Sequence, residues 1–213
     1  AARAVQAAGN VLLDPSVVSG HLAVALLIFS TLVTYTRRAR AEAGPAPIVL
    51  TPRPPGRLPA FAAATLLTYL QALLGGMVSS RHAGLACPDW PTCLGQWLPP
   101  MEGLVGLQMA HRFGAYLLTA VVLIAAAGVR GVSDLAVRRA GNAALALVVL
   151  QVILGVSNVY LQTPVWLSAL HLATATALLG VLLDATLRLA ARPGRALARA
   201  EVAVMGAGEG VLS

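Results

Sequence analysis

The sequence predicts an all-α membrane protein with five transmembrane helices, four of which form an antiparallel bundle. Of the 213 residues, 58% are hydrophobic and 11% are charged, whereas a soluble domain is about 25% charged. The apolar runs are each about 20 residues long, which is the length of helix that crosses a bilayer, and they do not alternate as barrel strands do. The expected spans are residues 17–36, 59–80, 105–129, 140–161 and 166–187.

The arginines are sorted between the loops, and this sorting predicts an orientation in the membrane. All 15 basic residues are arginine, and the formal net charge is +7. Twelve of them fall in the loops and tail that five spans place on one side, and such an excess marks the cytoplasmic side. We therefore expect a cytoplasmic C-terminus and an outward-facing loop at residues 81–104. The positive charge then needs no nucleic-acid partner to explain it.

Composition divides the chain into four segments. Residues 1–36 contain the first span, and residues 37–58 are rich in Arg and Pro without a helical period, which predicts a cytoplasmic linker. Residues 59–190 hold the four-helix bundle. Residues 191–213 are expected to form a cytoplasmic tail.

Two internal similarities predict a repeated unit. Residues 10–29 resemble residues 158–179, since both combine Asn-Val, a turn containing Pro and a His-Leu-Ala triplet that opens a span. LQALLGGMV at residues 70–78 also resembles LQVILGVSN at residues 150–158. The first span then corresponds to the last helix of a second four-helix unit. Of that second unit, the chain contains only this final helix. A chance likeness between alanine-rich spans is the alternative.

Three of the four histidines lie just inside the same ends of the expected spans, at similar depth. These are His21, His111 and His171. An ionisable residue within a span is costly to bury without a partner. His111 and His171 belong to the same bundle and can point from facing helices toward one plane, which suits the two axial positions of a haem iron. A histidine that hydrogen-bonds across the bundle, or reaches to the interface, is the alternative.

Other polar residues lie near these histidines. Arg112 follows His111 and needs a partner at that depth, either a haem propionate or the lipid headgroups. Gln71 and Gln151 lie within spans and are expected to form hydrogen bonds between helices. His82 lies in the outward loop and is expected to be solvated.

The only two cysteines, Cys87 and Cys93, lie in the outward loop as CPDWPTC. That compartment is oxidising, so a disulfide can persist there. The bond would be structural, or it would be redox-active if the short loop strains it. Zinc would need further ligands, for which His82 is one candidate. Trp90 and Trp97 are expected to anchor the loop at the membrane interface, and the alternative is that they cover the edge of a cofactor.

Three stretches together resemble the C-terminal half of the haem A synthase family, over roughly residues 1–190. These stretches are GGMVSSRHAGLACPDWPTCLGQWLPP, QMAHRFGAYLL and LQTPVWLSALHLATATALL. The resemblance implies a parent protein with two homologous four-helix bundles, the C-terminal one holding haem b. It also implies oxidation of the C8 methyl group of haem O to the formyl group of haem A, for terminal oxidases.

The resemblance assigns roles to residues of this chain. His111 and His171 correspond to the axial ligands of haem b in the C-terminal bundle, and Arg112 lies beside that haem. Cys87 and Cys93 correspond to the family's outer Cys pair, for which a disulfide is expected.

The same resemblance makes residues 1–36 the remnant of an N-terminal bundle, and the chain is expected to be truncated at its N-terminus. His21 corresponds to the last-helix histidine on the side of the substrate haem O. The family's Glu-x-x-His-Arg motif is absent, and Gln108 stands where its Glu would be, so the catalytic residue is unknown.

The sequence is compatible with three functions. The first is a haem A synthase, an oxidoreductase that acts with lipid, haem O synthase, terminal oxidase subunits or further copies of itself as partners. The second is a bis-His membrane cytochrome b that only carries electrons. The third is a thiol-oxidising protein, which lacks the second Cys pair it would need. The resemblance places the protein in the plasma membrane of a bacterium, with the Cys pair outside.

Overall fold

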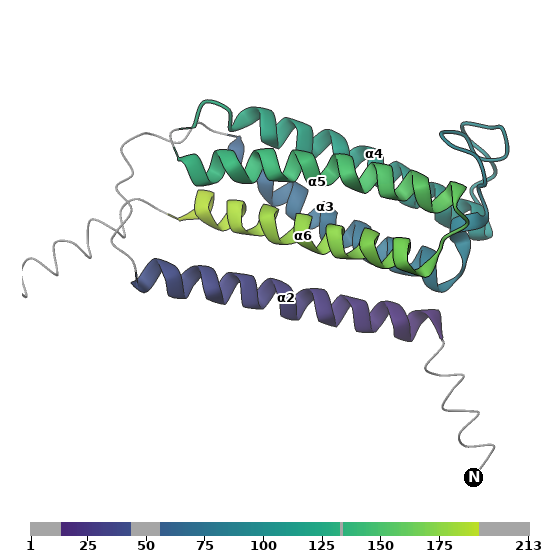
Figure 1. The fold of residues 1–213 in the computed structure, drawn as a ribbon, viewed down its shortest axis with the longest axis horizontal. Coiled ribbons are helices and arrows are strands. Elements are labelled where there is room, and N and C mark those ends of the chain that lie inside the picture. The colour runs from purple at the N-terminus through teal and green to yellow at the C-terminus, as the bar shows by residue number, and fades with distance from the viewer. Residues whose placement is uncertain (1–13, 44–55, 133, 192–213) are drawn as a thin grey trace, which may run out of the picture.

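The computed structural model describes residues 14–43, 56–132 and 134–191 (Figure 1). Five α-helices are long and apolar enough to cross a membrane, which confirms the predicted all-α membrane fold. α2 continues past residue 36 because RRARAEA is composed mainly of good helix formers. The elements are α2 (Pro15–Ala43), α3 (Arg57–Ser80), the 3₁₀ helix η1 (Ala83–Leu85), α4 (Gly103–Gly128), α5 (Leu135–Tyr160) and α6 (Val165–Ala190).

Local chemistry defines where the helices begin. Asp14 precedes α2 and accepts a hydrogen bond from the Ser16 amide at 2.8 Å, while Asp134 caps α5 by accepting from the Ala136 amide at 2.9 Å. These carboxylates satisfy amides that a helix leaves without partners at its first turn. Most of the predicted linker at 37–58 and of the tail at 191–213 lies outside the described residues, so these segments stay predictions.

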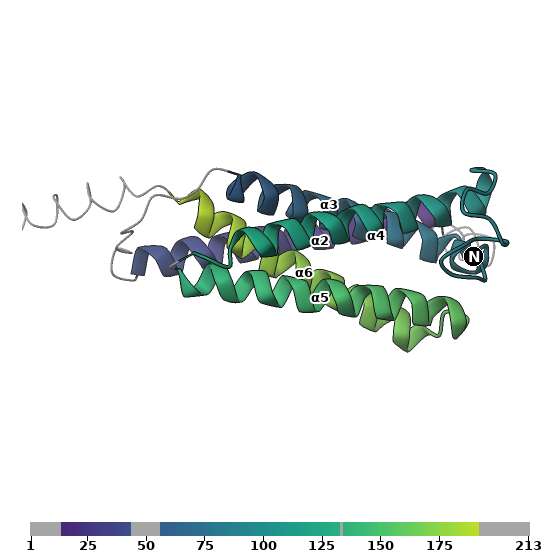
Figure 2. The ribbon, with the colours of Figure 1, turned by 90° about the horizontal axis from the view of Figure 1, so that it is seen from above.

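Helices α3 to α6 run alternately in opposite directions and lie around a common core (Figures 1 and 2). α4 and α6 each contact both α3 and α5, whereas within the described part of the chain the backbones of α4 and α6 do not come close to each other. α4 and α6 therefore lie on one diagonal of the four-helix bundle. α2 lies against the outside of this bundle and contacts α3 and α6.

Two glycines let α2 pack closely on the bundle. A Cβ atom at Gly76 of α3 would lie 2.7 Å from Cδ2 of Leu22, and one at Gly180 of α6 would lie 3.0 Å from Cζ of Phe29. Small residues at such contacts are how membrane helices approach one another. Near the other end of α2, Arg37 forms an ion pair of 3.5 Å with Asp184.

Much of the outer surface of the helices is apolar, as a lipid environment requires. The core enclosed by helices α3, α4, α5 and α6 contains Phe61, Val122, Val148 and Leu182 among its buried residues. Many large apolar residues nevertheless remain more than half exposed, which water would disfavour but lipid tails accept. Examples are Leu27, Ile28, Leu117, Ile124 and Ile153.

The described arginines are divided between the two ends of the bundle. Arg81 and Arg112 lie at or near the end that carries the loop between α3 and α4. The other end, called the Arg-rich end below, carries Arg37, Arg38, Arg40, Arg57, Arg130, Arg138, Arg139 and Arg188. The structure thus reproduces the predicted sorting among these residues, and the membrane face to which each end belongs stays a prediction.

Candidate haem-ligand site and the Cys loop

His111 lies on α4 and is held by a residue of α3. The Gln71 amide nitrogen lies 2.9 Å from Nδ1 of His111 and donates to the His111 carbonyl oxygen at 2.7 Å. One turn further along α3, a Cβ atom at Gly75 would lie only 3.0 Å from Cε1 of the imidazole. The imidazole therefore occupies space that any larger residue at position 75 would enter.

His171 lies on α6 and is placed in a related way by α5. The Gln151 amide donates to the His171 carbonyl oxygen at 2.8 Å and to Oγ1 of Thr174 at 2.5 Å. A Cβ atom at Gly155 would lie 3.4 Å from Cε1 of His171. Unlike the imidazole of His111, this ring has a buried Nδ1 atom with no hydrogen-bond partner.

The two histidines thus occupy matching positions in the two halves of the bundle. In both halves a Gln-x-x-x-Gly segment meets the histidine of the following helix, so the likeness between residues 70–78 and 150–158 is a repeat of structure. The expected interhelical role of Gln71 and Gln151 is confirmed. Both histidines are half-buried, on helices that lie across the bundle from each other.

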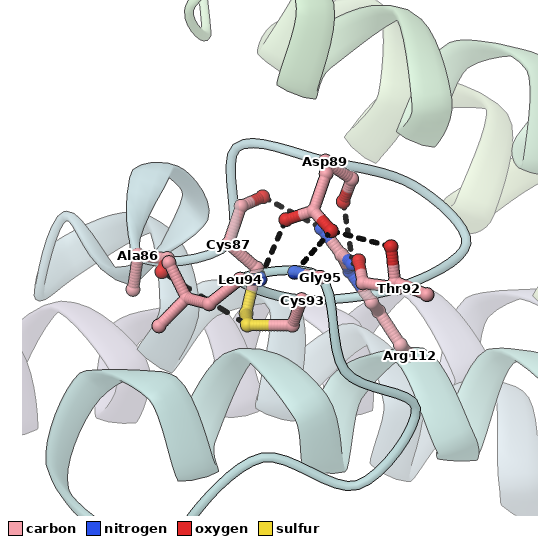
Figure 3. The surroundings of a disulfide bond; sticks show 8 residues. All are labelled: Ala86, Cys87, Asp89, Thr92, Cys93, Leu94, Gly95 and Arg112. Carbon is pink, nitrogen blue, oxygen red and sulfur yellow. Dashed lines mark hydrogen bonds between the residues drawn. A yellow bond between two sulfur atoms is a disulfide. The ribbon is translucent and has the colours of Figure 1, made fainter.

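Arg112 points into the loop between α3 and α4 (Figure 3). Its side chain is 6% exposed. Nη1 donates to the carbonyl oxygens of Asp89 at 2.8 Å and Thr92 at 2.6 Å, and Nη2 donates to that of Cys87 at 2.7 Å. Several carbonyls on one guanidinium suit its planar fork of donors. The residue next to His111 therefore fixes the loop onto α4.

Residues 81–102, the Cys loop, are closed by the predicted bond between Cys87 and Cys93. Both cysteines are fully buried and pack with Met109 and Val105 of α4. At the far side, the Tyr160 hydroxyl at the end of α5 donates to the Trp90 carbonyl at 3.3 Å. The loop thus rests on two helices of the bundle.

Asp89 organises the inside of the Cys loop (Figure 3). Its carboxylate accepts from the Leu94 amide at 2.7 Å, the Gly95 amide at 3.0 Å and the Thr92 hydroxyl. The hydrogen bond from Thr92, followed by that from the Gly95 amide, lowers the pKa of Asp89 to about 2. The carboxylate is therefore charged at neutral pH and stays so down to about pH 4.

The remaining candidates lie on α2, in the Cys loop and on α4. His21 is exposed on α2, and its Nδ1 atom lies 2.9 Å from the Val17 carbonyl of the same helix. His82 is exposed in the Cys loop, as expected. Gln108 is 5% exposed, and its Oε1 atom is buried without a hydrogen-bond partner.

Sequence reasoning missed Gly75, Gly155 and the role of Asp89. The two glycines stand at the same place in the repeated segments, so aligning those segments against the histidines could have found them. Asp89 carries no such signal, because its partners are backbone amides whose positions depend on the fold of the loop.

These features define a class: a polytopic helical membrane protein whose bundle places two histidines on diagonal helices beneath a disulfide-closed loop. The family model COX15-CtaA, described as cytochrome oxidase assembly protein, matches residues 5–183. The chain therefore belongs to the COX15-CtaA family.

Curated relatives support the same family. A haem A synthase from Methylobacterium radiotolerans is 34% identical over 75% of this chain and 46% of its own length. Another from Methylobacterium sp. (strain 4-46) is 34% identical over 81% of this chain and 51% of its own length. A third, from Bradyrhizobium diazoefficiens, is 34% identical over 81% and 50%. The chain spans about half the length of these relatives.

Proposed function

We propose that helices α3 to α6 bind a haem b through His111 and His171 as axial ligands. The observation that carries this proposal is the matched pair of imidazoles on diagonal helices, each with a glycine beside its Cε1 atom. The buried Nδ1 of His171 gives further support, because an unsatisfied buried polar atom costs about 1–3 kcal/mol and needs a reason. These residues fit the haem that the family implies.

A bound haem would supply redox chemistry, and the chain would supply its ligands and surroundings. The nitrogen of the Gln71 amide lies beside Nδ1 of His111 and also donates to the His111 carbonyl oxygen, so it fixes the orientation of the ring. The affinity of a ligating histidine depends on such partners of its other ring nitrogen. Gln71 is therefore a positioning residue for His111.

Arg112 and the Cys loop would close one end of the haem site. The three carbonyls that Arg112 binds hold the loop against α4, which would limit access of water to the histidines. The contact of Arg112 with a haem propionate stays a prediction. Whether the disulfide also exchanges electrons stays a prediction as well.

For the whole protein we propose haem A synthase activity, the oxidation of the C8 methyl group of haem O to the formyl group of haem A. The names of the relatives support this activity over a simple electron carrier. We assign no catalytic residue, because Gln108 stands at the motif position where the family has Glu. His21 is proposed to lie on the side of the substrate haem.

The setting of the protein is part of the same proposal. The fold and the family support an integral membrane protein, and we propose a bacterial plasma membrane with the Cys loop outside and the C-terminus in the cytoplasm. Haem O synthase, terminal oxidase subunits and further copies of the chain remain predicted partners.

Two substitutions test the ligand assignment. The chain is expressed with haem supply, and its low-spin haem spectrum is compared for the original protein, His111→Ala and His171→Ala. Each variant is expected to lose that spectrum, while His82→Ala, which changes an exposed loop histidine, should keep it. Unchanged haem content in either ligand variant would reject the assignment.

A further inference from the structure

A second candidate site lies at the Arg-rich end, opposite the Cys loop. A pocket of about 270 Å³ opens between the end of α4 and the start of α5. It is distinct from the histidine pair, and the proposed function does not use it. Its lining residues are Ala126, Val129, Arg130, Leu135, Arg138, Arg139 and Asn142.

The three arginines of this pocket carry charges that no residue in the described part of the chain neutralises. Within the described residues, none of their side chains forms a hydrogen bond or an ion pair. Arg37 and Arg188 at the same end differ, because both pair with Asp184. The acid nearest in sequence, Asp134, is engaged with the first amides of α5. The pocket therefore offers three guanidinium groups to a ligand from outside.

The floor of the pocket is apolar and closely packed. Val129 is 1% exposed and Ala126 is 7% exposed. A Cβ atom at Gly141 of α5 would lie 2.6 Å from Cγ2 of Val129, so the two helices approach closely below the pocket. Leu135 adds an exposed apolar side chain at the rim. A cationic rim over apolar walls matches a ligand with an anionic head and a hydrocarbon tail.

We propose that the pocket formed by Arg130, Arg138, Arg139 and Asn142 binds the phosphate headgroup of an anionic phospholipid. Guanidinium groups recognise phosphate through paired donors, which a lysine cannot reproduce. Basic pockets between membrane helices are suited to lipid headgroups. The exposed Leu135 beside the arginines would meet the start of an acyl chain, so the lipid is favoured over free phosphate.

The test uses the full chain in detergent, with lipid binding measured by native mass spectrometry. Phosphatidylglycerol, phosphatidylcholine and inorganic phosphate are titrated separately. The protein is expected to retain one phosphatidylglycerol more tightly than phosphatidylcholine. Arg138→Gln/Arg139→Gln should weaken this binding roughly thirtyfold, at about fivefold for each arginine. Arg138→Lys/Arg139→Lys should recover only part of the affinity.

The control is Arg38→Gln/Arg40→Gln, which removes two exposed arginines of α2 at the same end of the molecule. It should keep the tightly held lipid. Equal weakening in the two double variants would mean that binding depends only on the overall positive charge of this end, and the proposal would fail. It would also fail if phosphatidylcholine bound as tightly as phosphatidylglycerol, or if inorganic phosphate bound as tightly as the lipid. Helical circular dichroism checks that each variant is folded.

Discussion

The half of the bundle formed by α3 and α4 and the half formed by α5 and α6 share one plan but hold their histidines differently. Gln71 reaches the imidazole of His111, whereas Gln151 binds only the backbone of His171 and the hydroxyl of Thr174. The residue after His111 is the buried Arg112, and the residue after His171 is Leu172, which is 40% exposed. The first half therefore controls its imidazole through direct contacts, and the second leaves Nδ1 without a partner.

The connections between the helices explain part of this difference. α3 and α4 are joined by the long Cys loop, which supplies the carbonyls that Arg112 needs. α5 and α6 are joined by the short turn at residues 161–164, which has no room for a comparable structure. A repeated helix pair can thus keep its ligand position while its loop takes on a separate role.

The largest expected contrast is between Arg112→Ala and Leu172→Ala. Arg112→Ala leaves three loop carbonyls without their charged donor, and it should destabilise the docked Cys loop by about 2–4 kcal/mol. Leu172→Ala removes only a partly exposed apolar side chain and should change the stability of the docked Cys loop by less than about 0.5 kcal/mol. The measurement is the rate at which dithiothreitol reduces the Cys87–Cys93 bond. Equal rates in the two variants would show that Arg112 does not hold the loop.

A second contrast is between Gln71→Leu and Gln151→Leu. Loss of a hydrogen-bond partner of a ligating histidine typically lowers metal affinity about 10- to 100-fold. We expect such a loss of haem affinity for Gln71→Leu. Gln151→Leu should cause a smaller loss, since Gln151 does not touch the ring of His171. Haem titration of each variant measures this, and a larger effect of Gln151→Leu would reverse the proposed roles.

The sequence was sufficient for the spans and the histidine pair because both depend on simple regularities. Long apolar runs predict helices, and His111 and His171 stand at similar depths in two of them. The same regularities could not show what Arg112 binds. Its partners are the carbonyls of Cys87, Asp89 and Thr92, and a backbone carbonyl has no signature in sequence. Only the folded loop places these three groups together.

A third contrast concerns the glycines beside the rings. Alanine at Gly75 would crowd His111 at 3.0 Å, whereas alanine at Gly155 would meet His171 at an ordinary 3.4 Å. Overpacking costs about 1–3 kcal/mol, so Gly75→Ala should weaken haem binding about tenfold. Gly155→Ala should leave it nearly unchanged and should raise thermal stability, because alanine favours a helix by about 1 kcal/mol. The same haem titration, with a thermal melt, compares the two variants.

The smallest expected effect is a difference between the two connecting loops in how their stability responds to pH. The folded pKa of Asp89 is about 2, below its ordinary value of 3.8, so its carboxylate stabilises the Cys loop fully above about pH 4. This contribution is lost as the pH falls toward 2, because protonation is then required in the folded state too. The turn at residues 161–164 contains no acidic residue and should not respond.

Hydrogen exchange can resolve this difference. The amides of Leu94 and Gly95, which donate to Asp89, should lose protection between pH 4 and 2 after correction for the intrinsic exchange rate. The Thr163 amide, which donates to the Asn158 carbonyl at 2.7 Å, should keep its protection. Asp89→Asn should lower protection of the two loop amides already at neutral pH and remove its pH dependence. If their protection in the original protein fell between pH 6 and 4 instead, the Asp89 carboxylate would not be the group that holds the Cys loop.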